Sequence, residues 1–199
     1  MSLLFESIKV INGQMLCIGY HNQRINRARC QLLGQSERWD LLTMVTVPEL
    51  PYNQVCKCKI VYFGQLISVD FQPYIMRPLH SLKLVECNDL KYDYKYLGRS
   101  QLEQIKTSNP QADDIIIVRH GLITDCSYAN LVFFDGEKWI TPATPLLKGT
   151  KRQKYIDDQM IVENEIKASD LKYFSKTRII NAMIDLDESP DILMKNIFV

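Results

Sequence analysis

The pattern of apolar and polar residues divides the first half of the chain into short strands and helices. Residues 5–10 and 15–18 flank Asn12 and Gly13, a pair of residues that is typical of a two-residue hairpin turn. These two segments are therefore expected to pair as antiparallel strands. The same patterns predict helices at 21–33 and 39–45, with Gly34 ending the first, and strands at 57–63, 66–71 and 81–87.

The second half follows a polar segment, residues 86–98, that is rich in tyrosine and lysine and predicts a crossing between two lobes. Ser100 is expected to begin a helix, with Glu103 as its capping-box partner three residues later. The sequence thus predicts an α+β protein with a small lobe over residues 1–88 and a larger lobe over residues 89–199. Its further elements are expected as strands at 114–118, 130–134, 139–140 and 177–184 and as a helix at 149–159.

Composition restricts the class of protein. The chain has 199 residues, of which 46% are hydrophobic and 24% charged, and this excludes a disordered or low-complexity chain. Its 24 Lys and Arg against 23 Asp and Glu give a net charge of +1, so no basic field favours nucleic acid as a partner. No apolar run approaches the roughly 20 residues of a membrane helix, and no secretory signal is recognised. We therefore expect a cytoplasmic protein that binds neither membrane nor nucleic acid.

The cysteines and histidines do not form a metal-ligand pattern. The six cysteines lie at positions 17, 30, 56, 58, 87 and 126, without a CxxC pair or a regular framework, and are expected to be reduced. The three histidines, at positions 21, 80 and 120, lie too far apart in the sequence for a zinc motif. We therefore expect no metal site. Common motifs such as GxGxxG, HExxH and GxSxG are also absent from the sequence.

The candidate chemistry is carried by separated segments that follow one another in a specific order. These are FESI at 5–8 with HNQRI at 21–25, KYLGR at 95–99, GLITDCSYANLVF at 121–133, and WITP at 139–142 with LLKGTKR at 146–152. Together they resemble the signature segments of the class IV aminotransferases, which are fold-type IV enzymes that use pyridoxal 5'-phosphate (PLP). The resemblance implies a two-lobed D-amino-acid-aminotransferase-like fold, with a small α/β lobe and a larger pseudo-barrel lobe.

The resemblance assigns the catalytic amine to Lys95, which corresponds to the family's Schiff-base lysine, whereas Lys91 is the competing register. Such an amine has to lose its proton during part of the reaction, and burial or nearby positive charge would favour this. Arg99 falls where the family has a residue near the 3-oxygen of PLP. Arg24 corresponds to the arginine that binds the cofactor phosphate, and a guanidinium can pair with a phosphate through two hydrogen bonds.

The third and fourth segments imply the remaining cofactor contacts. Asp125 corresponds to the acidic residue, usually Glu, that pairs with the pyridine nitrogen of PLP and allows the ring to accept electron density. Asn130 follows at the spacing of the same motif, and Gly149 and Thr150 would offer backbone N–H groups at a helix N-terminus to the phosphate. By residue type alone, Asp125 could also be a turn residue. Lys151 could add charge near the phosphate or point to water.

Residues 181–184, with the sequence NAMI, resemble the corresponding strand of the aminodeoxychorismate lyases within this family. The implied activity is therefore that of a 4-amino-4-deoxychorismate lyase, which makes 4-aminobenzoate and pyruvate in folate synthesis. The alternatives are an aminotransferase for branched-chain or D-amino acids and a non-catalytic relative. Arg77 and Asn181 are candidate substrate-binding residues, Arg77 for a substrate carboxylate. The resemblance also implies a homodimer and an N-terminally shortened small lobe.

Overall fold

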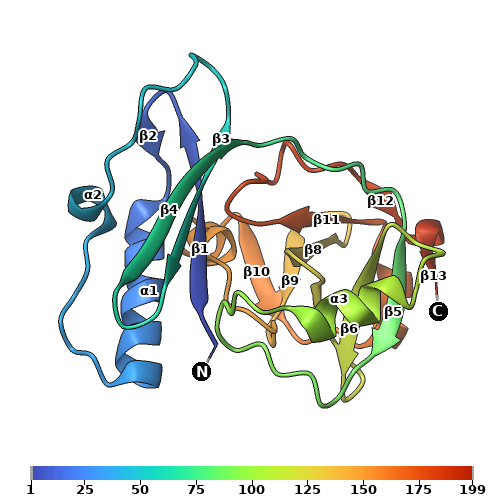
Figure 1. The fold of residues 1–199 in the computed structure, drawn as a ribbon. Helices are drawn as coiled ribbons and strands as arrows, with labels where there is room; N and C mark the ends of the chain where they lie inside the picture. The colour runs from blue at the N-terminus through green and yellow to red at the C-terminus, as the bar shows by residue number, and fades with distance from the viewer. Residues whose placement is uncertain (1, 199) are drawn as a thin grey trace. The chain divides into compact units, whose positions relative to one another are not determined.

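The computed structural model describes residues 2–198, which form two compact units (Figure 1). The first unit comprises residues 2–76 and 94–98, and the second comprises residues 77–93 and 99–198. Each unit combines strands with few helices, so the predicted α+β class is confirmed. No helix within the described range is long and apolar enough to cross a membrane.

The first unit is built on an antiparallel sheet with the strand order β2-β1-β3-β4. Asn12 and Gly13 join β1 to β2 with φ angles of 49° and 75°, so the predicted hairpin is confirmed. Two helices complete the unit. The bounds are β1 Leu4–Ile11, β2 Gln14–Met15, β3 Cys56–Tyr62, β4 Leu66–Pro73, α1 Ile18–Leu33 and α2 Leu41–Met44.

The longer helix, α1, packs Ile25 and Ala28 into a core formed with Ile8 and other apolar residues of the sheet. Gly34 ends α1 with a φ angle of 66°, as the sequence predicts. The predicted second strand over 15–18 is too long, because Cys17 adopts a φ angle of 54° and turns the chain into α1 at once. The helix therefore starts three residues before its predicted beginning.

Residues 94–98 return to the first unit and extend its sheet. β2 pairs with β1 at Val10 and Ile11, and the same edge of β1 extends beyond β2 as far as Leu4. The segment occupies this edge: Tyr96 forms an antiparallel bridge with Leu4, Phe5 N donates to Lys95 O at 3.0 Å, and Leu97 N donates to Leu3 O at 2.7 Å. The segment predicted as a crossing between lobes is thus bonded to β1 as a short added strand.

The second unit contains a longer mixed sheet with the order β10-β9-β8-β7-β6-β5-β13, with β11 beside β8 and β12 beside β11. β5 pairs in parallel with β6 and with β13, and β9 pairs in parallel with β10. Its bounds are β5 Leu82–Glu86, β6 Asp114–Arg119, β7 Leu122–Cys126, β8 Asn130–Phe134, β9 Trp139–Pro142, β10 Ile161–Asn164, β11 Lys176–Ile180, β12 Ile192–Leu193, β13 Ile197–Phe198, α3 Ser100–Thr107, α4 Thr150–Asp157, and the 3-10 helices η1 Ala168–Tyr173 and η2 Met194–Asn196.

The structure departs from three stated predictions for the second unit. Because β5 pairs with β6, residues 77–88 fold with the second unit, whereas the sequence placed them in the small lobe. The predicted capping box is wrong, because Ser100 is already helical and the N-cap of α3 is Arg99, without a side-chain cap. The predicted strand 177–184 ends at Ile180, since Asn181 and Ile184 close a tight turn through two backbone hydrogen bonds of 3.2 and 3.1 Å.

Candidate active site

Lys95 lies in the first unit and is half-buried. Its Nζ is 4.5 Å from the centroid of the Phe5 ring. Because the backbone of residues 94–98 is hydrogen-bonded to β1, the strand fixes the point from which the amine projects. Lys91, the competing candidate, is exposed and belongs to the second unit.

Glu6, which follows Phe5 on β1, is completely buried and faces two residues of α1. Arg24 donates from Nε to Glu6 Oε1 at 2.8 Å and from Nη2 to Glu6 Oε2 at 2.6 Å. His21 Nδ1 lies 2.7 Å from the same Oε2. The three side chains therefore form one buried polar cluster beside the segment that carries Lys95.

The charges of this cluster follow from its surroundings. Burial by itself raises the pKa of Glu6, but the Arg24 charge and the hydrogen bonds from His21 and Arg24 outweigh it and lower the pKa from 4.5 to about 2. Burial lowers the pKa of His21 below 6.5, although Glu6 opposes this effect. At neutral pH Glu6 is thus ionised, and a neutral His21 donates to it from Nδ1.

The pairing with Glu6 occupies N–H groups of Arg24 that a ligand could otherwise use. The sequence suggests that its guanidinium pairs with a phosphate, but in the structure Glu6 accepts two of its N–H groups. The role of Arg24 as a phosphate ligand stays a prediction. Sequence reasoning assigned no role to Glu6. The signal that points to it is a carboxylate on a strand face otherwise formed by Leu4, Ile8 and Val10, combined with a His and an Arg one helical turn apart in the following helix.

Asp125, on β7 of the second unit, is only 4% exposed. Its Oδ1 accepts a hydrogen bond from Asn130 Nδ2 at 2.7 Å, and its Oδ2 accepts one from Leu147 N at 2.9 Å. Burial raises the pKa of Asp125 to about 6, while these hydrogen bonds and the charge of Arg152 limit the rise. A cationic partner at this carboxylate would stabilise its ionised form.

Asn130 joins Asp125 to the beginning of α4. It pairs with Asp125 across β7 and β8, and its Nδ2 also donates to Leu147 O at 2.9 Å. Gly149 is the N-cap of α4, and a Cβ there would lie 1.9 Å from Asn130 Oδ1, so only glycine fits without displacing the asparagine. Thr150, the first residue of α4, is buried. The structure therefore brings Asp125, Asn130 and Gly149 into one contiguous cluster.

Two cations follow at the start of α4, and both have partners. Lys151 is buried and pairs with Asp185, so it does not point to water. Arg152 donates from Nη2 to Pro142 O at 2.7 Å and to Glu163 at 2.5 Å. Arg152 therefore ties α4 to the neighbouring strands β9 and β10.

The other predicted site residues lie at different places in the second unit. Arg99 donates from Nη2 to Ser127 O, in the turn between β7 and β8. Asn181 uses its Oδ1 to accept from Met183 N and Ile184 N at 2.8 and 3.1 Å, and its Nδ2 is 3.5 Å from the carbonyl oxygen of residue 128 in the same β7–β8 turn. Arg77 is exposed in the segment between β4 and β5, and no hydrogen bond of the described residues joins it to the Asp125 cluster. Within residues 2–198 no group of three or more His, Cys, Asp or Glu side chains could hold a metal ion.

Comparison with known proteins gives consistent matches. Residues 93–186 match the family model described as amino-transferase class IV. An uncharacterised protein of Haemophilus influenzae is 34% identical over 182 residues, which are 90% of this chain and 97% of that protein. The crystal structure of a "putative 4-amino-4-deoxychorismate lyase" from Haemophilus somnus has 30% identity and a TM-score of 0.83, over 92% of this chain and 97% of that one. The PLP-bound form of a "hypothetical aminotransferase" from Mycobacterium tuberculosis has 15% identity and a TM-score of 0.69, over 96% of this chain and 80% of that one.

Proposed function

This chain belongs to the class IV aminotransferase family of PLP-dependent enzymes, and we propose that it is a 4-amino-4-deoxychorismate lyase. Such an enzyme releases pyruvate from its substrate and leaves 4-aminobenzoate. The observation that carries the choice of lyase is the similarity to the Haemophilus somnus protein, which extends over nearly the whole of that chain. The sequence NAMI at 181–184, which resembles the lyases of the family, supports the same choice.

The donor set of the second unit fits PLP. Asp125 is a buried carboxylate, and burial raises its pKa to about 6. A protonated ring nitrogen of PLP would stabilise the ionised form of this carboxylate. Asn130 and the N–H of Leu147 hold the two oxygens of Asp125 in one orientation. Gly149 and Thr150 stand at the N-terminus of α4, where backbone N–H groups favour an anion such as the cofactor phosphate.

The first unit supplies the amine. Lys95 would hold the cofactor, give way to the amino group of the substrate, and then accept the α-proton of the substrate at Nζ. Lys95 is half-buried and its Nζ lies 4.5 Å from the centroid of the Phe5 ring, so this contact helps to hold the side chain in one place. When bound, PLP supplies an electron sink for the bond that breaks at the substrate's α-carbon.

An aminotransferase is the second candidate function, because the family model that matches residues 93–186 describes aminotransferases. An enzyme of that kind, acting on branched-chain or D-amino acids, would need 2-oxoglutarate or pyruvate as the acceptor of the amino group. The lyase needs no acceptor. The two functions therefore differ in one requirement that an assay can measure.

The test uses the purified protein loaded with PLP. Incubation with aminodeoxychorismate is expected to yield 4-aminobenzoate and pyruvate in equal amounts, without any added oxo acid, and Lys95→Ala is expected to yield neither. If PLP is bound but only amino transfer to an added oxo acid is observed, the lyase proposal is wrong and the aminotransferase is favoured. We further propose that the enzyme is a cytoplasmic homodimer that serves folate synthesis, and light scattering of the purified protein tests the dimer.

A further inference from the structure

The turn that joins β7 to β8 holds the Asp125–Asn130 pair at its two ends. Cys126 N donates to Ala129 O at 3.0 Å, and Cys126 Sγ lies 3.2 Å from the same oxygen. The Cys126–Ala129 pair therefore closes the turn. Because Asp125 and Asn130 are the residues on either side of this closure, their relative position depends on whatever holds the turn in place.

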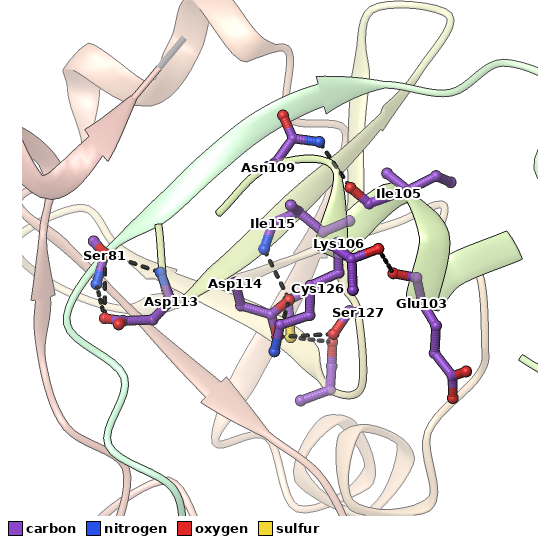
Figure 2. Close-up of polar contacts among 12 residues, drawn as sticks. Ser81, Glu103, Ile105, Lys106, Asn109, Asp113, Asp114, Ile115, Cys126 and Ser127 are labelled. Carbon is purple, nitrogen blue, oxygen red and sulfur yellow. Dashed lines mark hydrogen bonds and ion pairs between the residues drawn. The ribbon is translucent and has the colours of Figure 1, made fainter. Parts of the chain in front are cut away.

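Ser127, within this turn, is held from two directions. Its Oγ donates to Asp114 Oδ2 at 2.9 Å, and its carbonyl oxygen accepts a hydrogen bond from Arg99 Nη2. Figure 2 shows the Ser127 side chain pointing toward Asp114 on the neighbouring strand β6. Ser127 is only 7% exposed, so water does not readily replace either partner. Asp114, the first residue of β6, and Arg99, the N-cap of α3, are thus both hydrogen-bonded to this turn.

Asp114 has a completely buried side chain. Its Oδ1 accepts from Ile115 N at 2.8 Å and lies 3.9 Å from Lys106 Nζ. Burial raises the pKa of Asp114, and the hydrogen bond from Ser127 is the largest of the effects that oppose the rise. A buried carboxylate contributes less to stability than a well-packed apolar residue of similar size would. Asp114 is therefore better explained as a residue that orients the β7–β8 turn than as one that stabilises the fold.

Arg99 adds a second observation at the same place. Its Nε is buried and has no hydrogen-bond partner among residues 2–198, although its Nη2 is bonded to Ser127 O. A buried donor that stays unpaired is costly to a folded protein, and such donors are often satisfied by a bound ligand. Ser127 therefore holds a guanidinium that keeps a buried donor for a ligand.

We propose that Asp114 and Ser127 are positioning residues of the cofactor site. Ser127, oriented by the Asp114 carboxylate, holds the β7–β8 turn so that Asp125 and Asn130 stay paired and Arg99 stays in place for the bound cofactor. Neither Asp114 nor Ser127 touches the cofactor in this proposal. The inference rests on the proposed function, since it assumes that PLP binds at Asp125.

The preceding residue of the chain offers a matched control. Asp113 Oδ2 accepts from Ser81 Oγ at 3.2 Å, from Ser81 N at 3.0 Å and from His80 N at 2.7 Å. Asp113 is exposed, and Figure 2 shows Asp113 and Ser81 apart from the Asp114–Ser127 pair. The Asp113–Ser81 pair therefore has the same chemistry as the Asp114–Ser127 pair, but its hydrogen bonds do not involve the β7–β8 turn.

The test compares Ser127→Ala, Ser127→Thr, Asp114→Asn and the control Ser81→Ala with the unchanged protein. Two quantities are measured: the dissociation constant of PLP, by absorbance titration, and the rise in melting temperature that PLP causes. We expect Ser127→Ala to weaken PLP binding about tenfold, in keeping with the loss of a hydrogen bond to a charged group, and to reduce the rise. Ser127→Thr, which keeps the hydroxyl, and Ser81→Ala are expected to match the unchanged protein, and Asp114→Asn to lie in between.

The outcomes separate three possibilities. If Ser127→Ala lowers the melting temperature without PLP but keeps the full PLP-induced rise, Ser127 has only a structural role and the inference is wrong. If Ser127→Ala and the unchanged protein bind PLP equally, the inference is wrong and the proposed function stands. If the unchanged protein does not bind PLP at all, the proposed function fails and the inference fails with it. If Ser127→Ala does not fold, Asp114→Asn keeps the test decisive, because it changes the partner in the same hydrogen bond.

Discussion

Gly149 and Asn130 are in such close contact that the side-chain oxygen of Asn130 lies 1.9 Å from the position that a Cβ of residue 149 would take. Gly149 has a φ angle of −70°, which any residue can adopt. The need for glycine is therefore steric and is set by Asn130. Since Asn130 also holds Asp125, a side chain at residue 149 would disturb the proposed contact to the ring nitrogen.

Gly149→Ala is expected to weaken PLP binding and to lower the free energy of unfolding by about 1–3 kcal/mol, because the added methyl group displaces Asn130. Urea unfolding and PLP titration measure the two effects. Gly19→Ala is the matched control, since a Cβ at this helical glycine would meet nothing within 4 Å. It is expected to leave PLP binding unchanged and to stabilise the protein by about 0.5–1 kcal/mol. Unchanged PLP binding in Gly149→Ala would contradict the steric argument.

Asp125 predicts a specific pH dependence for the stability of the protein without PLP. Its pKa in the folded protein is about 6, above the ordinary value of 3.8, so the folded protein binds this proton more tightly than the unfolded chain does. The resulting stability is fully present below pH 4 and is lost as the pH rises through 6, by about 3 kcal/mol for a shift of two pKa units. Asp125→Asn should remove this loss. Urea unfolding between pH 4 and pH 7 measures it, and an identical profile in Asp125→Asn would disprove the assignment.

For Glu6 we expect the opposite pH dependence of stability, and we expect it at lower pH. Its pKa is lowered from 4.5 to about 2, so its contribution to stability is present above pH 4.5 and decreases as the pH falls toward 2. In Glu6→Gln this acid-dependent loss should be smaller, and the variant should be less stable at neutral pH because Arg24 loses its buried partner. Thermal unfolding between pH 2 and pH 7 measures both effects. Glu37→Gln, at an acidic residue in the exposed loop before α2, is the control and should keep the original profile.

Lys95 is expected to be the lysine that holds PLP. Borohydride reduction of the PLP-loaded protein, followed by peptide mapping, should place the label on Lys95. Lys95→Ala should show no reducible adduct, whereas Lys91→Ala, at an exposed residue, should be labelled as the unchanged protein is. A label on Lys91 would instead favour the competing register.

The parts of the fold that the sequence predicts well depend on local chemistry. Asn12 and Gly13 make the hairpin because both can adopt positive φ angles, and Gly34 ends α1 for the same reason. The two-lobed class IV fold, expected from separated motifs, is confirmed by the comparison with solved structures. The parallel pairing of β5 with β6 was not predictable, because it joins segments about thirty residues apart that carry no local signal of their partner.

The candidate site was predictable where a motif fixes both residue type and spacing. Asp125, Asn130 and Gly149 were predicted separately and lie in contact in the structure. Glu6 pairs with Arg24 because β1 packs against α1. Asp114 bonds to Ser127 because β6 lies beside the β7–β8 turn. Such pairings arise from packing rather than from spacing along the chain, so sequence patterns did not reveal them.

The added strand that carries Lys95 restricts which insertions and deletions this gene can accept. Side chains of an extended segment alternate in direction, so a shift of one residue within 94–98 would turn Lys95 to the opposite side of the strand. Changes of length at the exposed residues Lys91 and Asp93, just before it, do not alter this register. Natural length variation, and any engineered loop, is therefore expected at residues 91–93 and not within the five residues that follow.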